Sequence, residues 1–272
     1  MSHTLTPRVA IVTGAAQGLG KAIALRLAKD GLAVGLNDIP SKKNALDEVA
    51  KEIVKINGRA VVHVGDVSKQ EVVQNLIDTV VGTLGGLHVM VANAGMARPA
   101  PFLEESLETF NQVMSVNTTG LFICYQLAGR KMIELGSKGG RIIGASSIGG
   151  KQPLRGLTSY TASKFAVRGL TQSAALALGP HGITVNSYAP GLIDTPLETG
   201  SLVPTAFTPH LEDHTDLAFD KYSAVAPLRR VGQADEVAAL VSFLASKESG
   251  YMTGEEYVMH RYLSIDGGAH MD

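Results

Sequence analysis

The sequence predicts an α/β fold in which one doubly wound parallel sheet forms a single domain over residues 1–272. Short apolar runs rich in β-branched residues alternate with longer segments of helical periodicity. A glycine-rich turn joins the first run to the first helical segment. No linker, repeat or low-complexity tract interrupts the chain, and 45% of its residues are hydrophobic, which is enough for one large core.

The expected strands are separated by segments long enough to form the helices that connect parallel strands. These strands cover residues 8–13, 32–37, 60–65, 87–92, 141–145, 183–188 and 262–265. The least regular segment is a substrate-loop region at about 195–227, which four prolines interrupt. Because long loops in compact domains are usually functional, we expect it to be a mobile lid over the substrate. The alternative is a surface excursion or a contact between subunits.

The segment from Gly14 to Gly20 reads strand, glycine turn, helix. Glycine permits the tight turn, and the free N–H groups at the start of the helix attract an anion such as a phosphate. The spacing Gly-x-x-x-Gly-x-Gly differs from the usual dinucleotide fingerprint, Gly-x-Gly-x-x-Gly. The alternative is a glycine-rich turn that binds no ligand.

Asp38 ends the second expected strand, where a carboxylate can accept both hydroxyls of an adenosine ribose. A 2′-phosphate at that place would meet a like charge, so Asp38 favours NAD over NADP. Lys42 and Lys43 follow closely and would soften this discrimination. The alternative is that Asp38 only caps a helix that begins near Ser41.

Tyr160 and Lys164 are four residues apart in an expected helix, so their side chains share one face. A phenol has a pKa of about 10, and a nearby ammonium lowers it toward a range suited to proton transfer. The alternative is a half-buried tyrosine beside a solvated lysine.

Composition excludes several classes of function. The formal net charge of −1 provides no basic surface for nucleic acid or an anionic membrane. The single Cys124 excludes an intramolecular disulfide and fits a reducing compartment. The first seven residues lack the apolar core of a signal peptide, and no cysteine–histidine cluster has zinc spacing. We therefore expect a cytoplasmic protein that binds no metal, nucleic acid or membrane.

Seven ordered motifs together resemble the short-chain dehydrogenase/reductase family, whose fold is of the Rossmann type. They are Thr13-Gly14-x-x-x-Gly18-x-Gly20, Asp66-Val67, Asn93-Ala94-Gly95, Asn117, Ser147 with Tyr160 and Lys164, Pro190-Gly191, and Asp266-Gly267-Gly268. Ser147 lies 13 residues before Tyr160, which is the family's spacing for the catalytic serine.

The resemblance implies a role for each matching residue. The catalytic residues it implies are Asn117, Ser147, Tyr160 and Lys164. The cofactor-binding residues are Gly14, Gln17, Gly18, Leu19, Gly20, Asp38, Asp66, Val67, Asn93, Tyr160, Lys164, Pro190, Gly191, Ile193 and Thr195. The substrate residues are Ser147, Ile148, Gln152, Leu157, Tyr160 and Leu192.

Three stretches are similar to acetoin/diacetyl reductases, also called 2,3-butanediol dehydrogenases: Gln17 to Gly31, Lys164 to Gln172 and Tyr251 to Gly254. The implied function is NAD-dependent interconversion of a small secondary alcohol and a ketone, with NADP as the less favoured cofactor. One alternative is a 3-oxoacyl-carrier reductase, which needs a basic docking patch and usually NADP. Another is a non-catalytic nucleotide-sensing member of the fold, which would lack part of the catalytic tetrad.

The C-terminal tail departs from the family pattern. Eleven residues separate Gly254 from Asp266, where the family has about five. We expect the extra residues, near 255–261, to bulge before the last strand, where they would lengthen a loop or alter a subunit contact. The resemblance implies a homotetramer.

Overall fold

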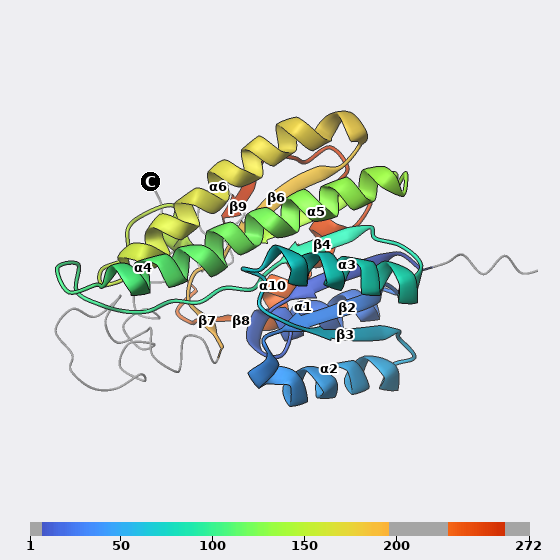
Figure 1. Cartoon of the computed structure of the whole chain (residues 1–272), viewed down its shortest axis with the longest axis horizontal. Helices are drawn as coiled ribbons and strands as arrows, with labels where there is room; N and C mark the ends of the chain where they lie inside the picture. The colour runs from blue at the N-terminus through green and yellow to red at the C-terminus, as the bar shows by residue number, and fades with distance from the viewer. Residues whose placement is uncertain (1–6, 196–227, 259–272) are drawn as a thin grey trace, which may run out of the picture.

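The computed structural model describes residues 7–195 and 228–258 of the chain. Its centre is a seven-stranded parallel sheet with the order β3-β2-β1-β4-β5-β6-β9 (Figure 1). The strands are β1 Val9–Thr13, β2 Ala33–Asp38, β3 Ala60–Val64, β4 Val89–Ala92, β5 Arg141–Ala145, β6 Thr184–Ala189 and β9 Glu256–Val258. The chain adds strands outward from β1 to β3 on one side and from β4 to β9 on the other. Such sheets bind ligands at the switch point between these two halves, which here lies between β1 and β4.

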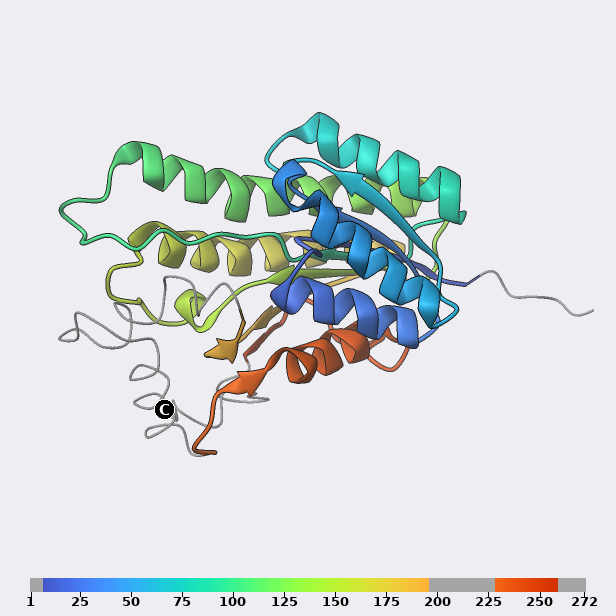
Figure 2. The ribbon, with the colours of Figure 1, turned by 90° about the horizontal axis from the view of Figure 1, so that it is seen from below.

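Helices cover both faces of this sheet (Figure 2). One face packs against α1 Gly18–Lys29, α2 Lys43–Lys55 and α10 Ala234–Ala245. The opposite face packs against α3 Gln70–Leu84, α5 Leu121–Glu134 and α6 Thr158–Leu178. A six-residue π-helix, η2 Ser115–Gly120, joins α4 Leu107–Met114 to α5. Short 3-10 helices are η1 Pro40–Lys42, η3 Ile148–Gly150 and η4 Gly179–His181.

The sequence pattern follows from this burial. Every residue of β1, β4, β5 and β6 is buried because helices lie on both sides, and β1 and β4 accordingly read as nearly continuous apolar runs. Helix α2 instead exposes one side, and its apolar residues Leu46, Val49 and Ile53 face the core at helical spacing.

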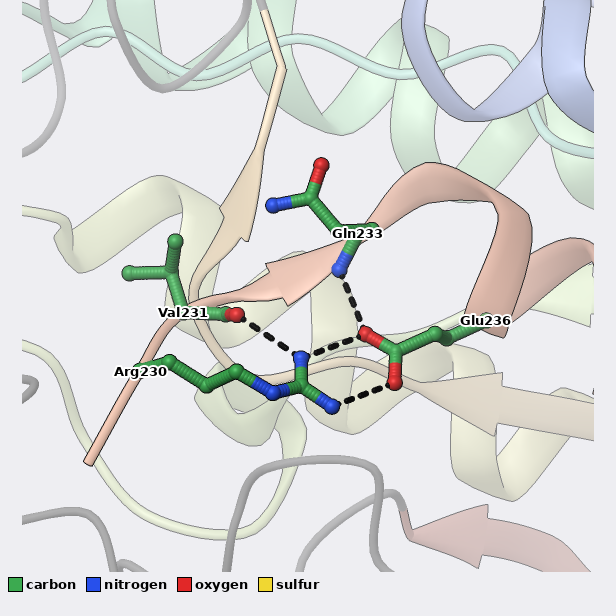
Figure 3. A network of polar contacts seen from close by, with 4 residues as sticks. All are labelled: Arg230, Val231, Gln233 and Glu236. Carbon is green, nitrogen blue, oxygen red and sulfur yellow. Dashed lines mark hydrogen bonds and ion pairs between the residues drawn. The ribbon is translucent and has the colours of Figure 1, made fainter. Parts of the chain in front are cut away.

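Two short strands, β7 Ile193–Asp194 and β8 Gly232–Gln233, pair in parallel beside the main sheet. Helix α10 begins directly after β8 with a capping box between Gln233 and Glu236. Arg230 reaches the same carboxylate with two hydrogen bonds of 2.7 and 2.6 Å (Figure 3). These contacts hold the segment before α10 against the first turn of that helix.

The predicted fold class is confirmed, and six of the expected strands match described strands closely. The expected strand at 262–265 lies outside the described residues, as does the proposed lid apart from Thr195. The expectation that residues 255–261 bulge before the last strand is wrong for Glu256–Val258, which form β9 and pair with β6. No helix in residues 7–195 and 228–258 is long and apolar enough to span a membrane.

Candidate active site

A cleft of about 490 Å³ opens at the carboxyl ends of the strands, around the switch between β1 and β4. The segments that follow β1, β2, β3, β4, β5 and β6 all contribute to its wall. Parallel strands bring their carboxyl ends to one edge, so residues far apart in sequence meet there.

The glycine turn after β1 leaves bare backbone at this edge. Gly14 has a φ of 65°, in the left-handed region that glycine tolerates. A Cβ on Gly20 would lie 2.0 Å from the carbonyl oxygen of Gly14 and 2.6 Å from Nδ2 of Asn93, so only glycine fits there. Helix α1 begins at Gly18 and directs its free N–H groups into the cleft. The turn can therefore receive a phosphate against backbone and a helix N-terminus.

Asn93 holds the ends of three strands together. Its Nδ2 donates to the carbonyl oxygens of Thr13 and Gly14 at 2.9 and 3.2 Å. Its Oδ1 accepts a hydrogen bond of 2.7 Å from the hydroxyl of Tyr188 on β6. The side chain is thus engaged within the protein while the residue lines the cleft.

Asp38 stands at the end of β2 with its carboxylate held by backbone. Oδ2 accepts from the N–H of Ala16 at 3.0 Å, and Oδ1 accepts from the N–H of Ile39 at 2.8 Å. Each oxygen keeps a further lone pair for a ligand hydroxyl. Lys42 lines the same cleft and donates to Gln17 at 2.8 Å, whereas Lys43 pairs with Asp47 at 2.6 Å on the outer surface.

The part of the cleft near Asp38 also fits a polar ligand. Asn37, which is 1% exposed, donates through Nδ2 to two backbone carbonyls, while its buried Oδ1 has no hydrogen-bond partner among the described residues. Such an orphaned acceptor in a cleft wall fits a donor on a bound molecule. Together with the glycine turn and Asp38, it makes this cleft suitable for a dinucleotide.

Ser147 follows β5 and caps the short helix η3. Its Oγ accepts a hydrogen bond of 3.1 Å from the N–H of Gly149. A Cβ on Gly149 would lie 3.5 Å from Ser147 Oγ and 3.3 Å from Cε1 of Tyr160. The serine hydroxyl and the tyrosine ring therefore approach the same glycine, one from β5 and one from α6.

Lys164 lies one helical turn after Tyr160, with its ammonium 5.3 Å from the centre of the tyrosine ring. The lysine is 4% exposed, and Nζ donates to the carbonyl oxygen of Ala145 at 2.7 Å. Burial lowers the pKa of Lys164 to about 8, although the negative charge of Glu256 partly offsets this effect. The ammonium form still predominates at neutral pH, beside the phenol that it would assist.

Asn117 lies in the π-helix η2, a distortion common at functional sites. Its amide exchanges two hydrogen bonds of 2.8 Å with the backbone of Met96 and donates to Ser163 Oγ at 3.0 Å. A Cβ on Gly95 would lie 3.4 Å from Asn117 Oδ1 and 3.6 Å from Lys164 Nζ. Asn117 therefore lies close to Lys164, although it is not part of the cleft wall.

Most residues predicted for the site line this one cleft. They are Gly14, Gln17, Gly18, Leu19, Gly20, Asp38, Asp66, Val67, Asn93, Ser147, Tyr160, Lys164, Pro190, Gly191 and Thr195. The remaining cofactor and substrate candidates are not among the residues that line it. Ile148, Leu157, Leu192 and Ile193 are at most 3% exposed and pack inward, and the partly buried Gln152 is also outside the cleft wall.

Sequence reasoning missed several residues of the wall. Three of them, Asn37, Gly65 and Tyr188, lie at or just after the ends of strands. Because parallel strands end at one edge of the sheet, their positions could have been predicted from the sequence. Arg98 and Gln112 reach the cleft from the segment between β4 and η2, and no pattern in the sequence marks them.

The arrangement places a hydroxyl, a phenol and a buried ammonium together at the end of a cleft that fits a dinucleotide. A phenol assisted by an ammonium can give or take a proton, and a hydroxyl can stabilise an oxyanion.

Comparison with known proteins agrees with this geometry. A family model for short chain dehydrogenases matches residues 8–202. The short-chain dehydrogenase/reductase eriH of Hericium erinaceus is 42% identical over 262 residues, which cover 96% of each chain. L-2,3-butanediol dehydrogenase of Corynebacterium glutamicum is 40% identical over 264 residues, covering 96% of this chain and 98% of the relative.

A crystal structure of a short-chain type dehydrogenase/reductase from Mycobacterium marinum has a TM-score of 0.84 and 34% identity to this chain. The match covers 97% of this chain and 96% of that one. The chain therefore belongs to the short-chain dehydrogenase/reductase family of nicotinamide-dependent oxidoreductases.

Proposed function

We propose that this protein uses NAD(H) to interconvert a small secondary alcohol and a ketone, with 2,3-butanediol, acetoin and diacetyl as the substrate set. The observation that carries the proposal is the meeting of Ser147, Tyr160 and Lys164 in one cleft beside Asp38 and the glycine turn. The relative named L-2,3-butanediol dehydrogenase, at 40% identity over nearly the whole chain, supports the substrate class. A cytoplasmic homotetramer stays a prediction of the family resemblance.

A bound nicotinamide supplies the hydride for reduction and accepts it in oxidation. During ketone reduction, the phenol of Tyr160 donates a proton to the carbonyl oxygen, and Ser147 donates a hydrogen bond to the developing alkoxide. During alcohol oxidation, the Tyr160 phenolate takes the hydroxyl proton while Ser147 orients the alcohol. The ammonium of Lys164 favours the phenolate in both directions because it places a positive charge beside the ring.

The substrate is tested by incubating the protein with NADH and a panel of carbonyl compounds and following the loss of reduced-nicotinamide absorbance. We expect turnover with diacetyl and acetoin, and NADH formation from NAD with 2,3-butanediol. A 3-oxoacyl thioester is the comparison substrate. A kcat/KM for the thioester above those for diacetyl and acetoin would contradict the proposed substrate set, and binding of NADH without turnover of any compound would contradict catalysis.

The cofactor preference depends on Asp38. A carboxylate held by two backbone N–H groups can accept ribose hydroxyls but repels a 2′-phosphate. We expect kcat/KM for NADH to exceed that for NADPH by at least about 10-fold, or about 1.4 kcal/mol. Asp38→Ser should reduce this ratio, because the serine removes the charge that opposes the phosphate.

The matched control is Asp47→Ser, because Asp47 pairs with Lys43 on the outer surface of α2. This variant should keep the cofactor ratio of the unmodified protein. If the unmodified protein uses NADH and NADPH equally, Asp38 does not select the cofactor.

A further inference from the structure

Glu256 is a buried acid on β9, beside β6. The two strands run parallel, and their register places Glu256 next to Ser187. The side chain of Glu256 is only 2% exposed. Burial of a carboxylate is costly unless hydrogen bonds or opposite charges compensate it, so this residue depends on its partners.

Both partners of Glu256 come from the segment that follows β5. Ser146 donates a hydrogen bond from Oγ to Oε1. The ammonium of Lys151 lies 2.6 Å from Oε2, and the lysine side chain is 26% exposed. This second contact is an ion pair without hydrogen-bond geometry, since Oε2 accepts no hydrogen bond from the described residues. Glu256 therefore ties β9 to the loop that carries the active-site serine.

The contacts of Glu256 continue to the groups in the cleft. Ser146 directly precedes Ser147, and Ser146 Oγ lies 3.4 Å from the backbone oxygen of Lys164. Lys164 Nζ donates to the carbonyl oxygen of Ala145, the residue before Ser146. A Cβ on Gly150 would lie 2.6 Å from Ser146 Oγ and 2.9 Å from the Lys164 oxygen, so these groups are tightly packed. Glu256 thus contacts the residue that links Ser147 to Lys164.

The balance of charge in this region also depends on Glu256. The titratable groups that interact with Glu256 are Lys151 in the loop after β5, Lys164 on α6 and Tyr125 on α5, and Tyr188 on β6 interacts in turn with Tyr125 and Tyr160. Burial raises the pKa of Tyr125 and of Tyr188, so both phenols stay neutral. Glu256 is the carboxylate of this group, and it faces two lysines.

We propose that Glu256 is a positioning residue of the active site, whose buried carboxylate holds the Ser146–Ser147 turn in place beside the buried Lys164. The inference rests on the proposed function to the extent that Lys164 assists Tyr160. Lys164 is buried, which favours its neutral amine, and a negative charge nearby opposes that tendency. Without Glu256, the ammonium would lose its proton at a lower pH and would cease to favour the phenolate.

The test compares Glu256→Gln with the unmodified protein, because glutamine keeps the shape of the side chain and removes its charge. In diacetyl reduction, we expect the rate of the unmodified protein to fall as Lys164 loses its proton near a pKa of about 8. In the variant, this alkaline limb should move to lower pH by about 0.5–1 unit, since a unit charge has left the same buried region. Glu255→Gln, on the exposed neighbouring residue, is the matched control and should leave the limb in place.

A purely structural role would lower the melting temperature of Glu256→Gln and leave the pH profile unchanged, and this outcome would overturn the proposal. Lys151→Gln provides a second variant, for which the expected shift of the alkaline limb is in the opposite direction. Its loss removes a cation near Lys164, so the alkaline limb should move to higher pH. A downward shift equal to that of Glu256→Gln would also overturn the proposal.

A direct titration separates this proposal from the proposed function. The Lys164 amine can be followed by NMR in protein labelled at lysine, with Lys164→Met used to assign its signal. Glu256→Gln should lower the pKa of Lys164 whether or not diacetyl is a substrate. An unchanged pKa would refute the role of Glu256, whereas a lowered pKa in a protein that turns over no ketone would support it and refute the proposed function alone.

Discussion

Tyr160→Phe is expected to lower the kcat of ketone reduction by a factor of about 10² or more. Phenylalanine keeps the ring that packs beside Gly149 and Lys164 but has no hydroxyl to donate a proton. The carbonyl oxygen would then have to take its proton from water, and Ser147 alone would stabilise the alkoxide. Steady-state kinetics with diacetyl and NADH measures the effect.

The variant should still bind NADH, because it leaves unchanged the glycine turn and Asp38, which line the same cleft. Titration of nucleotide fluorescence checks this, and Tyr251→Phe serves as the control because Tyr251 is fully exposed. If Tyr160→Phe turned over diacetyl at nearly the rate of the unmodified protein, the assignment of the proton donor would be wrong.

Gly20→Ala is expected to destabilise the protein by about 2 kcal/mol or more and to weaken NADH binding. The added Cβ would lie 2.0 Å from the carbonyl oxygen of Gly14, which is backbone and cannot rotate away. It would also lie 2.6 Å from Nδ2 of Asn93, the amide that joins the ends of β1, β4 and β6. Chemical denaturation measures the free energy of unfolding, and NADH fluorescence measures the binding.

The matched control is Gly82→Ala in helix α3. A Cβ there has no neighbour within 4 Å, and alanine favours the helix more than glycine does. This control should raise the free energy of unfolding by about 0.5–1 kcal/mol. Equal stabilities for Gly20→Ala and the unmodified protein would mean that the turn is looser than the structure indicates.

The buried strands were predictable because helices on both faces require apolar side chains throughout a strand. The apolar run Val9–Thr13 shows this pattern, and the strands expected from such runs begin and end within a few residues of the strands in the structure. β9 was not predictable, because it begins within the acidic pair Glu255-Glu256, and glutamate is uncommon in strands and seldom buried. Ser146 and Lys151, more than one hundred residues away in sequence, compensate the charge of Glu256, and only the folded chain brings them to it.

The polar residues of the cleft were predictable from motif spacing and from the meeting of strand ends. The apolar substrate candidates are not among the residues that line the cleft. Ile148, Leu157 and Leu192 neighbour the reactive segments in sequence, yet their side chains pack inward and are at most 3% exposed. Position along the chain places a residue near a site, whereas the direction of its side chain depends on local backbone geometry such as the η3 turn.

The central claim is that this cleft transfers hydride between NAD(H) and a small ketone with Tyr160 as the proton donor. The most direct measurement uses NADH that carries deuterium at the transferable position of the nicotinamide. The mass and amount of the product formed from diacetyl are compared between the unmodified protein and Tyr160→Phe. We predict acetoin with one deuterium on its carbinol carbon from the unmodified protein, and product formation reduced by about 10² or more in the variant. Product without deuterium, or equal labelled product from both proteins, would contradict the account.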